Sequence, residues 1–374
     1  ALIEPGSTLG GMMTGGLSRT DFGSIHALGG AFKAFLDDSL AAYVRDYGPN
    51  SKEVELCRDG LFFEPKVARA IFLDWLASVP SVEVMRECSL VGVDVLDRDV
   101  RAVVLHDRRR SLRRTLLADA FIDASYEGDL AAYAGASYLM GRESGDQYAE
   151  EHAGKLWWNV WERRVVEVVG TGDRQVQAYC YRLCLTKDVD NRLPPPRPGQ
   201  YDRERYVGLL IDIQNGRLKS LKDVLSILQL PRGKADANNH PQGDPSSDWV
   251  GGAEDYPEAD QATRDQLAAE HRDHILGLLW FLRFDPAVPE ALRFDAQQWG
   301  LPRDEFPETD GWPSQLYVRE GRRILGGKVF VEQDARSVGD SSRPPCQRDS
   351  IAVGAYPIDS HATGGRKVDD HDLL

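Results

Sequence analysis

A glycine-rich segment directly behind a short apolar run constrains this chain more than any other feature of its sequence. Residues Ala1–Ile3 predict the end of a β-strand, Glu4 follows, and the doublet Gly10–Gly11 comes six residues later. In dinucleotide-binding folds an acidic residue at a strand end accepts hydrogen bonds from the adenosine ribose, and glycines let phosphates approach the backbone. The G-x-G-x-x-G turn expected about 20 residues earlier is missing, because only three residues precede Glu4. An ordinary glycine-rich turn is therefore the alternative interpretation.

A second segment combines a strand, small residues and the start of a helix. Residues 118–125 are a nearly continuous apolar run, which predicts a strand buried on both faces. The run ends in Asp123–Ser125, whose small side chains let the chain pass close to a ligand. Gly128 and Asp129 follow, and we expect Asp129 to be the N-cap of the next helix. A plain strand–loop–helix connection explains the same residues.

The charge balance and the cysteines exclude several classes of protein. The 374 residues include 45 Lys+Arg and 59 Asp+Glu, a net charge of −14, which argues against a binder of nucleic acid or anionic membranes. No apolar run is long enough to predict a transmembrane helix. The five cysteines include no CxxC, so an iron–sulfur cluster or structural zinc is unsupported. We interpret Cys180 and Cys184 as buried small hydrophobic residues, with a metal or redox pair as the alternative.

Hydrophobic periodicity predicts the elements that carry these segments, and the length predicts two domains. We expect three amphipathic helices, a three-stranded antiparallel meander, two later strands and one long loop. The helices are 31–47, 64–78 and 259–284; the meander strands are 89–96, 100–107 and 111–118; the later strands are 164–170 and 176–186; the loop is 231–256.

Two stretches occur in a characteristic order. GGMMTGGL spans Gly10–Leu17 and IDASYEGDL spans Ile122–Leu130, with a helical segment and the meander between them. The run AYCYRLCLT, then Asn238–His240, then the runs DYPEAD and AEHRDH, and finally AYPIDSH (355–361) follow. This set resembles FAD-dependent oxidoreductases with a glutathione-reductase-type FAD domain. The resemblance extends over nearly the whole chain.

The resemblance implies a fold class and a cofactor, FAD. It implies an α/β protein in which a truncated, Rossmann-like FAD-binding domain with a β-meander is interrupted by an inserted α+β substrate domain. The expected division is 1–150 for the FAD-binding domain, 151–350 for the substrate domain and 351–374 for the return toward the FAD domain. The N-terminal GxGxxG strand and the C-terminal segment that closes over the flavin would lie outside this fragment. We therefore expect residues 1–374 alone to bind FAD weakly or not at all.

The resemblance also implies which residues bind the cofactor. Glu4 would bind the adenosine ribose, Gly10 and Gly11 would pack near the pyrophosphate, and Thr14–Gly16 would approach the flavin. Val93 would contact adenine through its backbone. Ser125 stands where Thr is commoner in the family and keeps the hydroxyl. The full implied set is Glu4, Gly10, Gly11, Met12, Thr14, Gly15, Gly16, Val93, Ala124, Ser125, Gly128 and Asp129.

A histidine near the end of the chain is the candidate acid/base. Adjacent residues cannot form a hydrolase triad, so Asp359, Ser360 and His361 do not indicate one. In an extended segment Asp359 and His361 share a face, which makes His361 a candidate acid/base toward a substrate; a structural histidine is the alternative. His271 and His274 have spacing that suits a metal, but we identify no third ligand and expect no metal site.

The expected activity is hydride transfer between FAD and a small or carbohydrate-like substrate, with the flavin supplying the redox chemistry. Two alternatives stay open. One is a non-catalytic binding or carbohydrate-associated module; the other is an NAD(P)-linked enzyme, because a ribose-binding acid does not distinguish the two cofactors. The expected partner is a small-molecule substrate, with neither nucleic acid nor membrane. The sequence leaves the substrate, the electron acceptor and the oligomeric state open.

Overall fold

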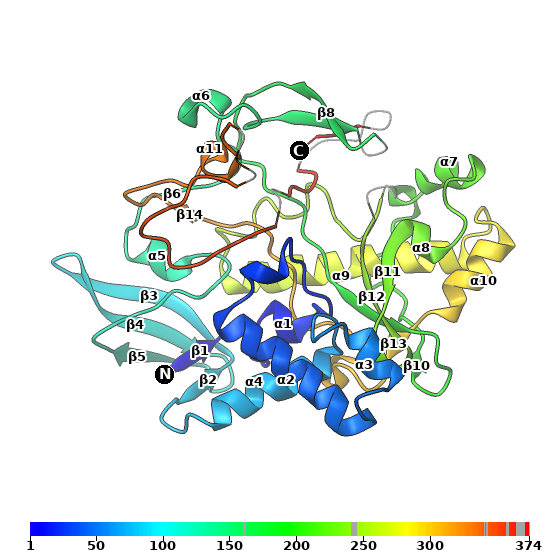
Figure 1. Cartoon of the computed structure of the whole chain (residues 1–374), viewed down its shortest axis with the longest axis horizontal. Helices are drawn as coiled ribbons and strands as arrows, with labels where there is room; N and C mark the ends of the chain where they lie inside the picture. Colours follow the sequence, from blue (N-terminus) through cyan, green and yellow to red (C-terminus); the bar gives the residue numbers. More distant parts are fainter. Residues whose placement is uncertain are drawn as a thin grey trace. The chain divides into compact units, whose positions relative to one another are not determined.

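The chain divides into two compact units, each built from several segments (Figure 1). The computed structural model describes residues 1–159, 162–240, 245–339, 341, 343–356, 359–363 and 371–373. Unit 1 comprises Ala1–Cys88, Tyr179–Trp249 and Arg264–Tyr317, and unit 2 comprises Ser89–Ala178, Val250–Thr263 and Val318–Leu374. The expected domain division at residues 150 and 350 stays a prediction.

Unit 1 contains most of the helices. Its helices are α1 (Met12–Gly15), α2 (Gly30–Tyr47), α3 (Lys52–Cys57), α4 (Pro65–Ala77), α7 (Leu209–Gln214), α8 (Leu221–Val224), α9 (Gln261–Phe284, from Arg264 onward) and α10 (Glu290–Gln298). Its strands are β1 (Leu2–Glu4), β2 (Val84–Arg86), β9 (Leu183–Thr186), β10 (Arg192–Leu193), β11 (Leu225–Gln229), β12 (Lys234–Asn239) and β13 (Leu301–Pro302).

Unit 2 contains most of the longer strands. The strands of unit 2 are β3 (Cys88–Leu96), β4 (Asp99–Asp107), β5 (Leu112–Leu117), β6 (Tyr138–Leu139), β7 (Leu156–Asn159), β8 (Arg164–Val168), β14 (Arg323–Ile324) and β15 (His371–Leu373). Its helices are α5 (Asp129–Tyr133), α6 (Gly145–Tyr148) and α11 (Glu332–Ala335). The strands β3, β4 and β5 form one sheet in that order.

The core of unit 1 lies where α2 and α4 pack together, and both helices run where the sequence predicts them (Figure 1). Pro65 is the first residue of α4, a position that needs no backbone N–H donor. Phe35 of α2 meets Phe63 edge to face, with ring centroids 5.0 Å apart. Both rings are almost completely buried. This core supports the segment that follows β1, because Met13 and Leu28 pack against it.

Two sheets frame the glycine-rich segment in unit 1. β1 pairs in parallel with β2, so that Leu2 lies opposite Val84 and Glu4 opposite Arg86. A second, antiparallel sheet has the order β11–β12–β9. The molecule is thus a mixed α/β protein, consistent with a FAD-binding fold. A Rossmann-like sheet and an inserted substrate domain stay predictions.

Several expected elements are confirmed. The helices predicted at 31–47, 64–78 and 259–284 correspond to α2, α4 and α9, and the predicted meander corresponds to β3, β4 and β5. Cys180 and Cys184 are both fully buried, as their interpretation as small hydrophobic residues requires. In the part of the chain that the structure describes, no helix combines the length and the hydropathy needed to span a bilayer.

The strand expected at 118–125 is wrong. β5 ends at Leu117, and Ile122 is 89% exposed. A strand buried on both faces needs hydrogen-bonded neighbours on both sides, and none of the strands in the described residues pairs with this stretch. The apolar run therefore takes an irregular path toward α5.

Two other expectations are wrong in part. The loop predicted at 231–256 contains β12, which is the central strand of its sheet; residues 241–244 of that loop lie outside the described residues. The strand predicted at 176–186 has a regular ladder only over Leu183–Thr186, preceded by isolated bridges at Tyr179 and Cys180. The sequence pattern does not predict β12 because the strand contains polar residues. Lys234 and Asp236 are buried there against opposite charges.

Candidate functional site

The first part of the candidate site is the turn that follows β1 in unit 1. Glu4 ends β1 half-buried, and its Oε1 accepts a hydrogen bond from the Gly6 N–H at 2.6 Å. Gly10 and Gly11 have φ of 99° and 53°, values that residues with a Cβ rarely adopt. A carboxylate at the end of a parallel strand, followed by left-handed glycines, is a donor and acceptor set that fits a nucleotide's ribose and phosphates.

The turn continues into α1, whose last residues are held by close packing. A Cβ on Gly15 would lie 2.5 Å from Cβ of Gln315, and a Cβ on Gly16 would lie 3.1 Å from the backbone oxygen of Arg182. The Gln315 N–H donates to the Gly15 carbonyl at 3.0 Å. Thr14 is buried, and its hydroxyl donates to the Leu9 carbonyl. The glycines at 15 and 16 are therefore required by the protein's own packing, whatever ligand lies nearby.

The implied cofactor residues before this packed end lie in one continuous segment of unit 1. Met12 is the first residue of α1 and is 7% exposed, so its side chain belongs to the protein interior. The structure thus brings together the residues from Glu4 to Gly16 that the sequence singled out. Their roles toward FAD stay predictions.

The second implied segment lies in unit 2, between β5 and α5. The Asp123 carboxylate accepts hydrogen bonds from the Ser125 N–H at 3.0 Å and from the Ser125 hydroxyl at 2.7 Å. Ser125 Oγ in turn accepts from the Gly128 N–H at 2.9 Å. Ala124 and Ser125 are exposed. These contacts give the loop a fixed turn and leave its small residues at the surface of the unit.

Asp129 is the first residue of α5 rather than its N-cap, which is Gly128 with φ of 72°. The expected capping role is taken by Asp123, whose second oxygen accepts from the Ala131 N–H at 3.1 Å. The Asp129 carboxylate instead pairs with the Arg322 guanidinium at 2.7 Å. The Asp129 side chain therefore forms an ion pair with Arg322 instead of capping the helix.

Val93 and His361 complete the predicted set, and both belong to unit 2. Val93 lies in β3 and is partly buried. His361 is held by its backbone N–H, which donates to Oε1 of Gln177 at 2.9 Å. Its Nε2 lies 3.8 Å from the Asp359 carboxylate, so the two side chains face each other as alternation predicts. Pro357 and Ile358 of the same segment lie outside the described residues.

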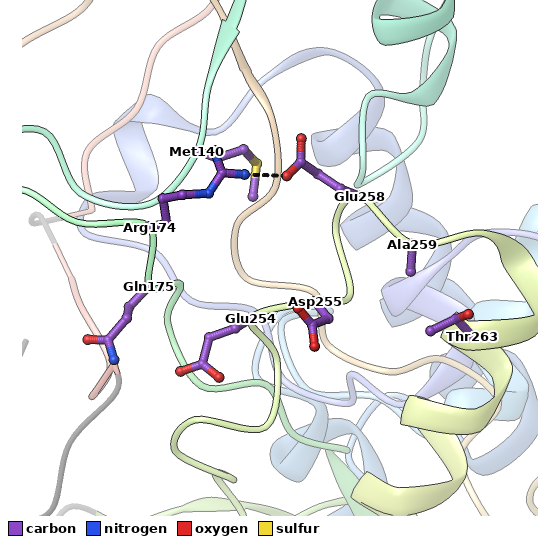
Figure 2. A pocket seen from close by; sticks show the side chains of 8 residues that line it. All are labelled: Met140, Arg174, Gln175, Glu254, Asp255, Glu258, Ala259 and Thr263. Carbon is purple, nitrogen blue, oxygen red and sulfur yellow. Dashed lines mark hydrogen bonds and ion pairs between the residues drawn. The ribbon is translucent and has the colours of Figure 1, made fainter.

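A cavity of about 760 Å³ opens within unit 2 (Figure 2). Its lining includes the acidic part of the DYPEAD run, and Figure 2 shows Glu258 paired with Arg174 at 2.5 Å. Burial, together with Asp255, raises the pKa of Glu254. The lining residues are Met140, Arg174, Gln175, Glu254, Asp255, Glu258, Ala259 and Thr263. Carboxylate, amide and hydroxyl groups share the lining with apolar groups, so the cavity offers several hydrogen-bonding partners to a ligand.

The sequence reasoning missed a buried ionic cluster in unit 1. The Lys234 ammonium lies 2.6 Å from Glu64, 2.9 Å from Asp304 and 2.5 Å from Glu305. The carboxylate oxygens converge as metal ligands would, but the ammonium already occupies the position between them. Burial raises the pKa of Glu305 to about 7. No local motif signals this cluster, because its members come together only in the folded chain.

His271 and His274 serve the protein core. Both are buried, and their rings lie 4.8 and 5.7 Å from the ring of Trp249. Nε2 of His274 is 3.0 Å from the Ser246 carbonyl. Burial lowers the pKa of His274 to about 4, so this ring is neutral at physiological pH. The two histidines therefore contribute their rings to the aromatic packing between α9 and Trp249.

The role of the turn after β1 toward a nucleotide cofactor stays a prediction, while the comparison with known families shows the family. The family model described as FAD dependent oxidoreductase matches residues 1–373. The chain therefore belongs to the FAD dependent oxidoreductase family, and FAD is its cofactor. This membership answers the choice between FAD and NAD(P). No curated protein and no solved structure matches the chain.

Proposed function

We propose that this oxidoreductase transfers a hydride between FAD and a small substrate rich in hydroxyl groups. The observation that carries the proposal is the carboxylate of Glu4 at the end of a parallel strand, six residues before Gly10 and Gly11 with their positive φ. In a family that uses FAD, this arrangement supports binding of the adenosine ribose at Glu4 and of the pyrophosphate at the glycines. When bound, FAD supplies the hydride acceptor.

The remaining roles fall to side chains of unit 2. Ser125 and Asp129 would contact the cofactor from the turn that Asp123 fixes. His361 would take the proton from a substrate hydroxyl while the carbon that bears this hydroxyl gives up the hydride. Asp359 would stabilise the protonated ring. The 3.8 Å separation of these two side chains supports this pairing.

The substrate class follows from the cavity of unit 2. Glu254 and Asp255 offer hydrogen-bond acceptors, Arg174 offers donors, and Gln175 and Thr263 offer both (Figure 2). A ligand with several hydroxyl groups can satisfy such a lining, whereas an apolar ligand would leave its polar groups without partners. We therefore propose a carbohydrate-like alcohol as substrate.

The test is flavin reduction by a panel of aldoses, sugar acids and polyols, followed by stopped-flow absorption. With the substrate that reduces the wild type, we expect His361→Gln to keep the flavin spectrum and to slow reduction by roughly 10²–10⁴-fold, the span for loss of a general base. His26→Gln is the matched control, because His26 is an exposed histidine of unit 1. Reduction of His361→Gln at the wild-type rate would make His361 structural. A panel that leaves the flavin oxidised throughout would contradict the proposed substrate class.

A further inference from the structure

A buried ion pair lies behind the glycine-rich segment of unit 1. The Arg182 guanidinium contacts the Asp236 carboxylate at 2.7 Å, and both side chains are only 1% exposed. Arg182 directly precedes β9, and Asp236 lies in β12, the neighbouring strand of the same sheet. Taking two charges out of water costs several kcal/mol per ion, which their attraction offsets only in a fixed geometry. The pair is therefore a rigid point of the unit.

Ser18 connects this rigid point to the glycine-rich segment. Its side chain is fully buried, and its hydroxyl donates to the second oxygen of Asp236 at 3.0 Å. The Ser18 carbonyl accepts from the Phe63 N–H at 3.0 Å, so the residue is held from two directions. Ser18 comes two residues after Gly16, whose backbone already lies against the backbone of Arg182.

We propose that the Arg182–Asp236 pair, acting through the Ser18 hydroxyl, positions the glycine-rich segment Gly10–Gly16 for FAD. This inference rests on the proposed placement of FAD over that segment. Arg182, Asp236 and Ser18 are positioning residues, since none of them needs to touch the cofactor. Loss of the Ser18 hydroxyl removes the contact with Asp236, while the backbone hydrogen bond from Phe63 and the ion pair itself stay in place.

The test compares two buried serines in unit 1. Ser18→Ala removes the hydroxyl that contacts Asp236, whereas Ser39→Ala removes an equally buried hydroxyl from α2. FAD is titrated into the apoprotein of the full-length protein, with flavin fluorescence and visible circular dichroism as readouts. Urea unfolding of each variant reports the loss of stability separately. We expect Ser18→Ala to lose more stability than Ser39→Ala, because the Ser18 hydroxyl donates to a carboxylate whereas the Ser39 hydroxyl lies 4.0 Å from Sγ of Cys57.

Only Ser18→Ala should weaken FAD binding, by about 3–10-fold, the usual effect of one lost hydrogen bond. Its bound flavin should also show an altered visible circular dichroism spectrum. Wild-type FAD affinity and spectrum in Ser18→Ala would overturn the inference. Glu4→Ala distinguishes failure of the positioning role from failure of the proposed FAD placement. If Glu4→Ala weakens FAD binding while Ser18→Ala does not, only the positioning role fails. If neither variant changes FAD binding, the proposed placement of FAD fails too.

Discussion

Lys234 shows at the scale of one residue how a charge can be buried in a protein interior. Its ammonium is completely buried between Glu64, Asp304 and Glu305. A second ammonium, that of Lys66, lies 3.3 Å from Glu64. At Glu305 burial outweighs the attraction of Lys234 and raises the pKa of this carboxyl to about 7.

This cluster predicts a dependence of stability on pH. The folded protein keeps the Glu305 proton up to about pH 7, whereas the unfolded chain releases it near the ordinary value of 4.5. Between these values the folded state binds more protons, so the contribution of Glu305 to stability falls as the pH rises. We expect wild type to lose roughly 1–3 kcal/mol relative to Glu305→Gln between pH 5 and pH 8. Urea unfolding at both pH values measures it.

Glu308→Gln provides the control for this prediction. Glu308 lies in the same stretch of chain, but its side chain is 31% exposed and pairs with Arg69 at the surface. The difference in the free energy of unfolding between Glu308→Gln and wild type should change little over the same pH range. A constant difference between wild type and Glu305→Gln from pH 5 to pH 8 would show that Glu305 is ionised throughout.

The glycine-rich segment is the element on which the account depends, and its packing gives a prediction. In Gly15→Ala the added methyl group would overlap Gln315 and press on Ser314. We expect a loss of about 1–3 kcal/mol in the free energy of unfolding, the usual cost of overpacking, measured by urea denaturation. Gly327→Ala is the control, because a Cβ there would meet nothing within 4 Å. Equal stabilities of the two variants would mean that the segment moves aside at no cost.

Element prediction succeeded where the sequence carries a local pattern. α2, α4 and α9 have helical periodicity, and the meander has alternation bounded by charged turns. Residues 118–125 are apolar, but a strand also needs neighbours, which are a property of the tertiary structure. The prediction at β12 is wrong for the opposite reason. Its sequence KADANN is polar, and its buried charges are paired only after folding.

The candidate site was predictable in the same measure. Glu4 and the glycines to Gly16 are close in sequence, so their spacing predicts a nucleotide turn, with an ordinary glycine-rich turn as the alternative. The Arg182–Asp236 pair and the Lys234 cluster join residues far apart along the chain. No short motif contains such contacts, and one sequence holds no record of which distant charges meet. The structure was needed to find them.

At the scale of the whole molecule, the account describes a flavoprotein built from two compact units. Unit 1 carries Glu4 and the glycine-rich segment, and unit 2 carries the meander, Ser125 and His361. The family match over residues 1–373 includes both units, so the family membership holds for the chain as a whole.

The most direct test of the account is an FAD titration of the full-length apoprotein, followed by visible absorption. We expect a bound flavin spectrum that saturates at about one FAD per chain and bleaches on chemical reduction. Glu4→Ala should weaken the binding by roughly 1–3 kcal/mol, the range for hydrogen bonds to a charged acceptor. Full saturation by Glu4→Ala at the wild-type FAD concentration would remove Glu4 from the site. A wild-type protein that acquires no flavin bands at any FAD concentration would contradict the central claim.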